Sequence, residues 1–180
     1  EAATEMTPEH LKYRRDLQTG GKILGGKGTL VRMPELEGKE FLVSPSSNLI
    51  VPNPEQPRTN FDPVKMAELE TTIRDVGQKN AIAVVPFYDG KRIKLFIIDG
   101  ERRFRVLRDM TKSPHARITI KWAPDQRAIL KTSLVLNESF APHNAMERAR
   151  AYQELIRLAE EEGNKHPIPG LARELGLSYG

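Results

Sequence analysis

The fold is decided by the stretch Ile97-Ile98-Asp99-Gly100-Glu101-Arg102-Arg103-Phe104-Arg105-Val106-Leu107. An apolar β-type run ends in Asp-Gly, and the apolar spacing that follows is helical, so the stretch predicts a strand, a tight turn and a helix start. Glycine lets backbone N–H groups approach an anion, and a helix N-terminus carries partial positive charge. The guanidinium groups of Arg102, Arg103 and Arg105 match phosphate oxygens. We therefore expect a phosphate-binding turn at Gly100.

The composition places the chain among soluble globular proteins and predicts a cytoplasmic location. Its 180 residues are 38% hydrophobic and 29% charged, which allows a sizeable core. No run approaches membrane-spanning length, and the start lacks the layout of a signal peptide. Cysteine is absent, which excludes disulfides and thiol nucleophiles, and the four scattered histidines argue against zinc. The net charge of +4 permits an anionic partner without requiring one.

Residues 1–47 are interpreted as a basic N-terminal arm that is mobile and contains many glycines. Five glycines between positions 20 and 28 break any regular pattern of apolar residues. An ordered loop region or a leader segment is the alternative interpretation.

Residues 48–123 predict an α+β domain built on a small mixed sheet. Strands are expected over 49–51, 81–88, 93–98 and 118–123, and Pro86 predicts a sheet edge or a bulge. A helix is expected from Asp62, as N-cap, to Gly77. Its buried face is predicted to hold Met66, Leu69, Ile73 and Val76. A second helix is expected over 101–110.

Residues 124–180 predict an all-α region: a helical connector and the first part of a helix-turn-helix. Helices are expected from Asp125 to residue 137, over 142–162 and over 168–176. The second is predicted to bury Met146, Ala149, Tyr152, Leu155 and Ile156. Gly176 at a turn and Ser178 as the next cap are typical of a helix-turn-helix, and Arg173 and Ser178 are the candidate DNA-binding residues. We expect a fragment of a longer protein, truncated before its recognition helix.

In this order, the motifs resemble the ParB family of chromosome- and plasmid-partition proteins, over about residues 48–178. The matching residues are Asn53-Pro54 with Gln56-Pro57-Arg58, the box Gly100-Glu101-Arg102-Arg103, the helix at 147–152 and the helix-turn-helix opening. The resemblance implies a ParB/sulfiredoxin-like N-terminal domain. The catalytic cysteine of sulfiredoxin has no counterpart here, because the chain has no cysteine.

The resemblance implies a CTP-binding DNA clamp associated with the nucleoid. Family members load at a centromere-like DNA site through the helix-turn-helix, bind CTP with Mg²⁺, and switch between open and closed homodimers. A partner partition ATPase is also expected, and no membrane. The resemblance places Gly100, Glu101, Arg102 and Arg103 at the triphosphate, with Arg58 in the same region, and gives Gln56 a role in CTP hydrolysis.

One departure from the family concerns its second phosphate motif, Glu-Asn-x-x-Arg. Asn137 is kept and is the candidate metal residue, whereas Leu136 and Phe140 replace the Glu and the Arg. Glu138 lies about 200° around a helix from the expected carboxylate and cannot stand in for it. We therefore predict weak or absent CTP hydrolysis.

Two other functions stay open. The altered second motif allows a DNA-binding adaptor or transcription regulator that works without nucleotide. A nuclease on the same fold would need a metal, which Asp99, Glu101 and Glu138 could hold. Against the nuclease, these acids form no compact cluster in the sequence, and Arg102 and Arg103 beside them are better suited to phosphate.

Overall fold

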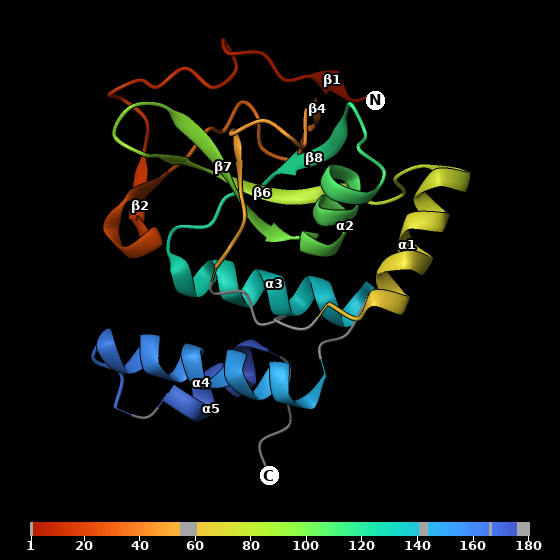
Figure 1. The fold of residues 1–180 in the computed structure, drawn as a ribbon. Helices are drawn as coiled ribbons and strands as arrows, with labels where there is room; N and C mark the ends of the chain where they lie inside the picture. The colour runs from red at the N-terminus through yellow and green to blue at the C-terminus, as the bar shows by residue number, and fades with distance from the viewer. Residues whose placement is uncertain (1, 55–60, 141–143, 166, 176–180) are drawn as a thin grey trace.

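The computed structural model describes residues 2–54, 61–140, 144–165 and 167–175. Among these residues, eight strands form one mixed sheet of order β1-β4-β8-β6-β3-β2, with β7 beside β6 and β5 beside β7 (Figure 1). The strands are β1 (Thr4–Glu5), β2 (Thr19–Ile23), β3 (Gly28–Val31), β4 (Glu40–Val43), β5 (Ile50–Val51), β6 (Ile82–Tyr88), β7 (Ile93–Asp99) and β8 (Ala116–Ile120). The helices are α1 (Pro63–Val76), α2 (Glu101–Arg105), α3 (Gln126–Phe140), α4 (Ala145–Glu161) and α5 (Pro167–Glu174).

Helices cover both faces of the sheet. Successive side chains of a strand point to opposite faces, so the apolar strands present an apolar surface on each face that a helix can cover. On one face, Ile73 of α1 and Phe104 of α2 pack with Ile82 and Val84 of β6. On the other face, Ile129 of α3 joins a cluster that contains alternate residues of β6 and β7. Figure 1 shows α4 and α5 on the side of α3 away from the sheet, where a separate apolar cluster joins the three helices. The α+β prediction with a small mixed sheet is confirmed.

The interpretation of residues 1–47 as a mobile arm differs from the structure. Four strands of the sheet lie in this region: β3 pairs with β6, and β4 pairs with β8. Leu30 and Val31 are fully buried in the core. Glycines in this region do not indicate flexibility, because Gly25 and Gly26 have positive φ and form the tight turn between β2 and β3. They connect two strands rather than form a flexible tail.

The predicted caps at Asp62 and Asp125 and the predicted end of a helix at Gly77 are confirmed. The Asp62 carboxylate accepts a hydrogen bond from the Val64 N–H at 2.9 Å, and Gly77 ends α1 with φ 80°. Asp125 caps α3 through the Ala128 N–H at 2.7 Å. These contacts satisfy N–H groups that a helix start leaves unpaired. The caps therefore fix where both helices begin.

The predicted buried faces of two helices are partly wrong. Val76 of α1 and Met146 of α4 are more than half exposed, and Ala149 is exposed too. The buried face of α4 follows the i, i+4 series Glu147, Ala151, Leu155 and Ala159 instead. Small alanines face the neighbouring helices, and a pattern based on large apolar residues does not find them.

Two strand predictions also need correction. Pro86 lies inside the sheet, because β6 pairs with β7 along 83–88, and β8 and β3 share its other edge over 82–84 and 87–88. Pro86 lies in the gap between these two neighbours, which accommodates a residue without an N–H. The register irregularity lies at Ala83/Val84 instead. The last strand covers 116–120 rather than 118–123, since it pairs with β4 from Ala116 onwards.

Candidate nucleotide-phosphate site

The centre of the candidate site is the turn between β7 and α2. Gly100 follows the last residue of β7 and has φ 100° and ψ 22°, a left-handed conformation that favours glycine. A Cβ atom there would lie 3.2 Å from the Cα atom of Ile82, a fully buried residue of β6. Both the backbone conformation and the close approach to β6 therefore require glycine. The predicted strand, turn and helix start are confirmed, and the helix continues through a π-helical turn, η2 (Val106–Met110).

Arg103 holds this turn against the start of β6. Its guanidinium donates hydrogen bonds to the carbonyl oxygens of Asn80 at 2.9 Å and Ala81 at 2.7 Å, and it pairs with the Asp99 carboxylate at 3.2 Å. The Arg103 side chain is only 16% exposed. The structure thus brings Arg103 to the turn but directs its guanidinium to the chain itself.

Arg102 lies on the same helical turn with more of its donors available. In the described part of the chain, its guanidinium donates one hydrogen bond, to the Lys65 carbonyl oxygen at 3.3 Å. That bond is long and lies at the surface. Arg102 is therefore the guanidinium of this box that can turn towards an anion at the least cost.

Glu101 is buried at the start of α2, with only 6% of its surface exposed. Its Oε1 atom accepts a hydrogen bond from Arg105 Nε at 3.2 Å, while Oε2 has no hydrogen-bond partner among the described residues. Burial raises the pKa of Glu101, and the hydrogen bond and charge of Arg105, with the charge of Arg108, oppose that rise. The Glu101 carboxylate therefore contacts the Arg105 guanidinium and has little contact with solvent.

Arg105 differs from its expected role as a phosphate donor. Besides its bond to Glu101, its guanidinium lies 3.8 Å from the centre of the Phe61 ring. Such a contact between a cation and an aromatic ring is attractive. Arg105 therefore joins α2 to the residue that directly follows 55–60. The sequence did not point to Phe61 or to the carbonyl oxygens of residues 65, 80 and 81. Every residue has a backbone carbonyl, so the residue type does not show which one accepts a hydrogen bond.

The structure places only some of the other predicted site residues. Gln56, Arg58 and Ser178 lie outside the described residues. Asn137 belongs to α3, but its side chain is outside the described part. Arg173, the candidate DNA-binding residue, lies in α5, in the helical layer beyond α3.

Two further observations concern the acidic residues. The described residues contain no group of three or more His, Asp or Glu that could hold a metal ion. Asp99, one of the acids considered for a nuclease, pairs with Arg103.

Within the described ranges, the helices include none with the length and apolar character that a membrane span needs.

The sandwiched sheet and the glycine turn with its arginines define an α+β domain with a candidate anion site. Residues 35–138, more than half of the chain, match the family model of the ParB N-terminal domain. The chain belongs to the ParB N-terminal domain family.

Two relatives are the nucleoid occlusion proteins of Bacillus thuringiensis (strain Al Hakam) and Bacillus mycoides (strain KBAB4). Each is 38% identical over 109 residues, which are 61% of this chain and 36% of the relative. The chain thus spans about a third of the length of the curated relatives it matches.

Among solved structures, a Pnob8-like ParB-N domain has a TM-score of 0.52 at 17% identity, covering 76% of this chain and 52% of that one. This likeness concerns the fold. The C-terminally truncated ParB of Caulobacter crescentus, complexed with CTP-gamma-S, has a TM-score of 0.49 at 25% identity, with 78% of this chain and 73% of that chain covered.

Proposed function

We propose that this chain is part of a ParB-like DNA-partition or nucleoid-occlusion protein and that its Gly100 turn binds the triphosphate of CTP. The observation that carries the proposal is the left-handed Gly100 at the end of β7, followed by a helix that begins with Glu101 and Arg102. It lies inside the matched residues 35–138. The nucleotide is assigned as CTP from the resemblance of the motifs to the ParB family.

The residues at the turn fit a chain of phosphates. The first N–H groups of a helix have no partner within that helix, so those after Gly100 are donors for phosphate oxygens. Arg102 would add its guanidinium, and we propose that Arg58 contributes a second one. CTP would supply the negative charge that these donors bind. Asn137 is the candidate residue for holding Mg²⁺, which needs few protein ligands because it usually keeps several waters, and which would offset the negative charge of the phosphates.

Arg103 has a different proposed role from Arg102. Its guanidinium binds the Asn80 and Ala81 carbonyl oxygens and the Asp99 carboxylate. We assign it the task of holding the turn in shape beside β6, so that the N–H groups after Gly100 stay aligned. Its loss would then weaken both folding and nucleotide binding.

The rest of the proposed mechanism concerns DNA. A centromere-like site would be bound through the helix-turn-helix that α5 opens, with Arg173 and Ser178 as candidate contacts. CTP would shift a homodimer from an open to a closed form around the DNA by binding the closed form more tightly. A partition ATPase is the expected partner. Gln56 is the candidate for CTP hydrolysis, which we expect to be weak because Leu136 and Phe140 replace the family's Glu and Arg.

The test is calorimetric titration of the chain with CTP, ATP, GTP and UTP, each with and without Mg²⁺. We expect CTP to bind most tightly and Arg102→Ala to weaken it about tenfold or more, since a hydrogen bond to a charged group contributes about 1.5–3 kcal/mol. Arg92→Ala is the matched control, because Arg92 is an exposed arginine between β6 and β7.

Other outcomes would point elsewhere. Binding of a DNA site by the full-length protein without binding of any nucleotide would favour the adaptor. Cutting of supercoiled plasmid in the presence of Mg²⁺ would favour the nuclease.

A further inference from the structure

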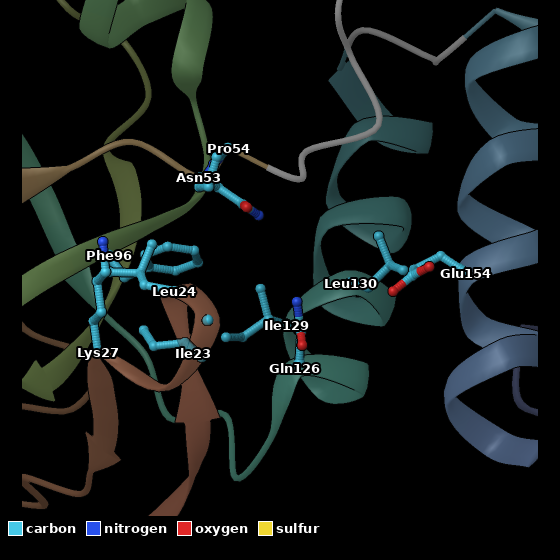
Figure 2. Close-up of a pocket in the computed structure, with 11 residues that line it drawn as sticks. Ile23, Leu24, Lys27, Asn53, Pro54, Phe96, Gln126, Ile129, Leu130 and Glu154 are labelled. Atoms are coloured by element: carbon cyan, nitrogen blue, oxygen red, sulfur yellow. The ribbon is translucent and has the colours of Figure 1, made fainter. Parts of the chain in front are cut away.

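A cavity lies between the β2–β3 hairpin, β7 and α3 (Figure 2). Its volume is about 340 Å³. This is at the small end of the range of about 300–1,000 Å³ that is usual for small-molecule sites. None of Gly100, Arg102 and Arg103 lines it. The cavity is large enough for a small organic molecule.

The inner wall of the cavity is apolar. It includes the side chains of Ile23, Leu24, Phe96 and Ile129, which come from the hairpin, β7 and α3 (Figure 2). Ile23, Phe96 and Ile129 are buried members of the core cluster on the α3 face. An apolar group that enters would remove its own surface from water without moving the core, which favours binding.

Charged groups at the rim decide what kind of ligand fits. Lys27 and Glu154 both line the cavity. Glu154 accepts two hydrogen bonds from the Arg157 guanidinium, which hold its pKa below the usual range and offset its charge. The Lys27 backbone N–H bonds to the Leu24 carbonyl oxygen, whereas its side-chain ammonium has no ion-pair or hydrogen-bond partner among the described residues. The uncompensated charge at the rim is therefore positive.

Much of this cavity lies outside the segment that defines the family. Ile23, Leu24 and Lys27 precede residue 35, and Glu154 follows residue 138, whereas the matched segment is 35–138. The β2–β3 hairpin thus adds a wall to a surface of α3 and β7. Pro54 also lines the cavity, so an occupant would contact the residue that directly precedes 55–60.

We propose that this cavity binds a small organic anion, a carboxylate with an apolar body, whose carboxylate pairs with Lys27. The apolar body lies against Phe96 and Ile129. The site is separate from the proposed nucleotide site, so it stands or falls independently of CTP binding.

The test uses sodium octanoate and its neutral analogue octanamide, titrated into the ¹⁵N-labelled chain and followed by amide chemical shifts. Octanoate should give saturable shifts at residues 23–27, 96 and 129, with tighter binding than octanamide. Lys27→Ala should weaken octanoate about two- to fivefold, as expected for a solvent-exposed ion pair, and should remove the preference over octanamide. Lys39→Ala, an exposed lysine outside the cavity lining, should change neither.

A second variant fills the cavity. Leu24 is only half-buried and already has φ 56°, so Leu24→Trp adds bulk without adding a new backbone strain, and octanoate binding should be lost. Absence of saturable shifts, or an unchanged octanoate preference in Lys27→Ala, would overturn the proposal. Displacement of octanoate by CTP with Mg²⁺ would assign the cavity to the nucleotide and overturn the separate site.

Discussion

Replacing Gly100 by alanine tests the geometry of the candidate site directly. An alanine at φ 100° carries the cost of a left-handed L residue, about 1–2 kcal/mol. Its Cβ would also lie 3.2 Å from the Ile82 Cα atom, and backbone in the centre of a sheet cannot easily move away. Overpacking of this kind typically costs about 1–3 kcal/mol.

The matched control is Gly90→Ala in the turn between β6 and β7. Gly90 has φ 92°, close to that of Gly100, but an added Cβ would meet nothing within 4 Å. It therefore carries the backbone cost without the contact. We expect Gly90→Ala to lose about 1–2 kcal/mol and Gly100→Ala about 2–5 kcal/mol of unfolding free energy.

The assay is thermal unfolding of both variants, followed by CTP titration below their midpoints. For a chain of this size, each kcal/mol lowers Tm by about 2–4 °C, so the Tm of Gly100→Ala should fall by about 4–20 °C and further than that of the control. CTP binding should be lost in Gly100→Ala and kept in Gly90→Ala. Equal stability of the two variants, or equal CTP affinity, would show that the close approach of Gly100 to Ile82 does not matter for folding or for binding.

Three further substitutions test the contacts of Arg103, Asp62 and Glu101. Arg103→Ala should lower the unfolding free energy by about 1–3 kcal/mol in urea unfolding, because it removes charge-assisted bonds to two carbonyl oxygens; an unchanged midpoint would contradict its holding role. Asp62→Ala should cost about 1 kcal/mol through the lost α1 cap, whereas Asp75→Ala, near the other end of α1, should not. Burial raises the pKa of Glu101, so its contribution to stability is present below the ordinary glutamate value of about 4.3 and is lost as pH rises through the folded value. Relative to wild type, Glu101→Gln should thus gain stability between pH 4 and pH 7, and a pH-independent difference would contradict the buried charge.

The helix α1, the strand β7 and the Gly100 turn were predictable from the sequence. The Asp62 cap with Pro63 and the Gly77 end set the bounds of α1, and the apolar run before Asp99-Gly100 set β7 and the turn. These features depend on residues that are near one another in the chain. The family resemblance depended on the same local motifs.

The rest depends on contacts between distant segments. The β2–β3 hairpin becomes part of the sheet only because β3 pairs with β6, more than fifty residues away. Pro86 fits inside the sheet because two different strands share one edge of β6. At the site, Arg103 was expected to face phosphate, but its partners include backbone carbonyl oxygens, which residue types do not reveal.

Hydrogen exchange at the start of α2 tests the central claim most directly, because it reports on the N–H groups proposed to hold phosphate. We compare amide exchange of the chain with and without CTP and Mg²⁺. If CTP binds at the Gly100 turn, exchange at Glu101, Arg102 and Arg103 should slow when CTP is added and should not change with an equal concentration of chloride salt. Unchanged exchange at these amides at a saturating concentration of CTP would contradict it.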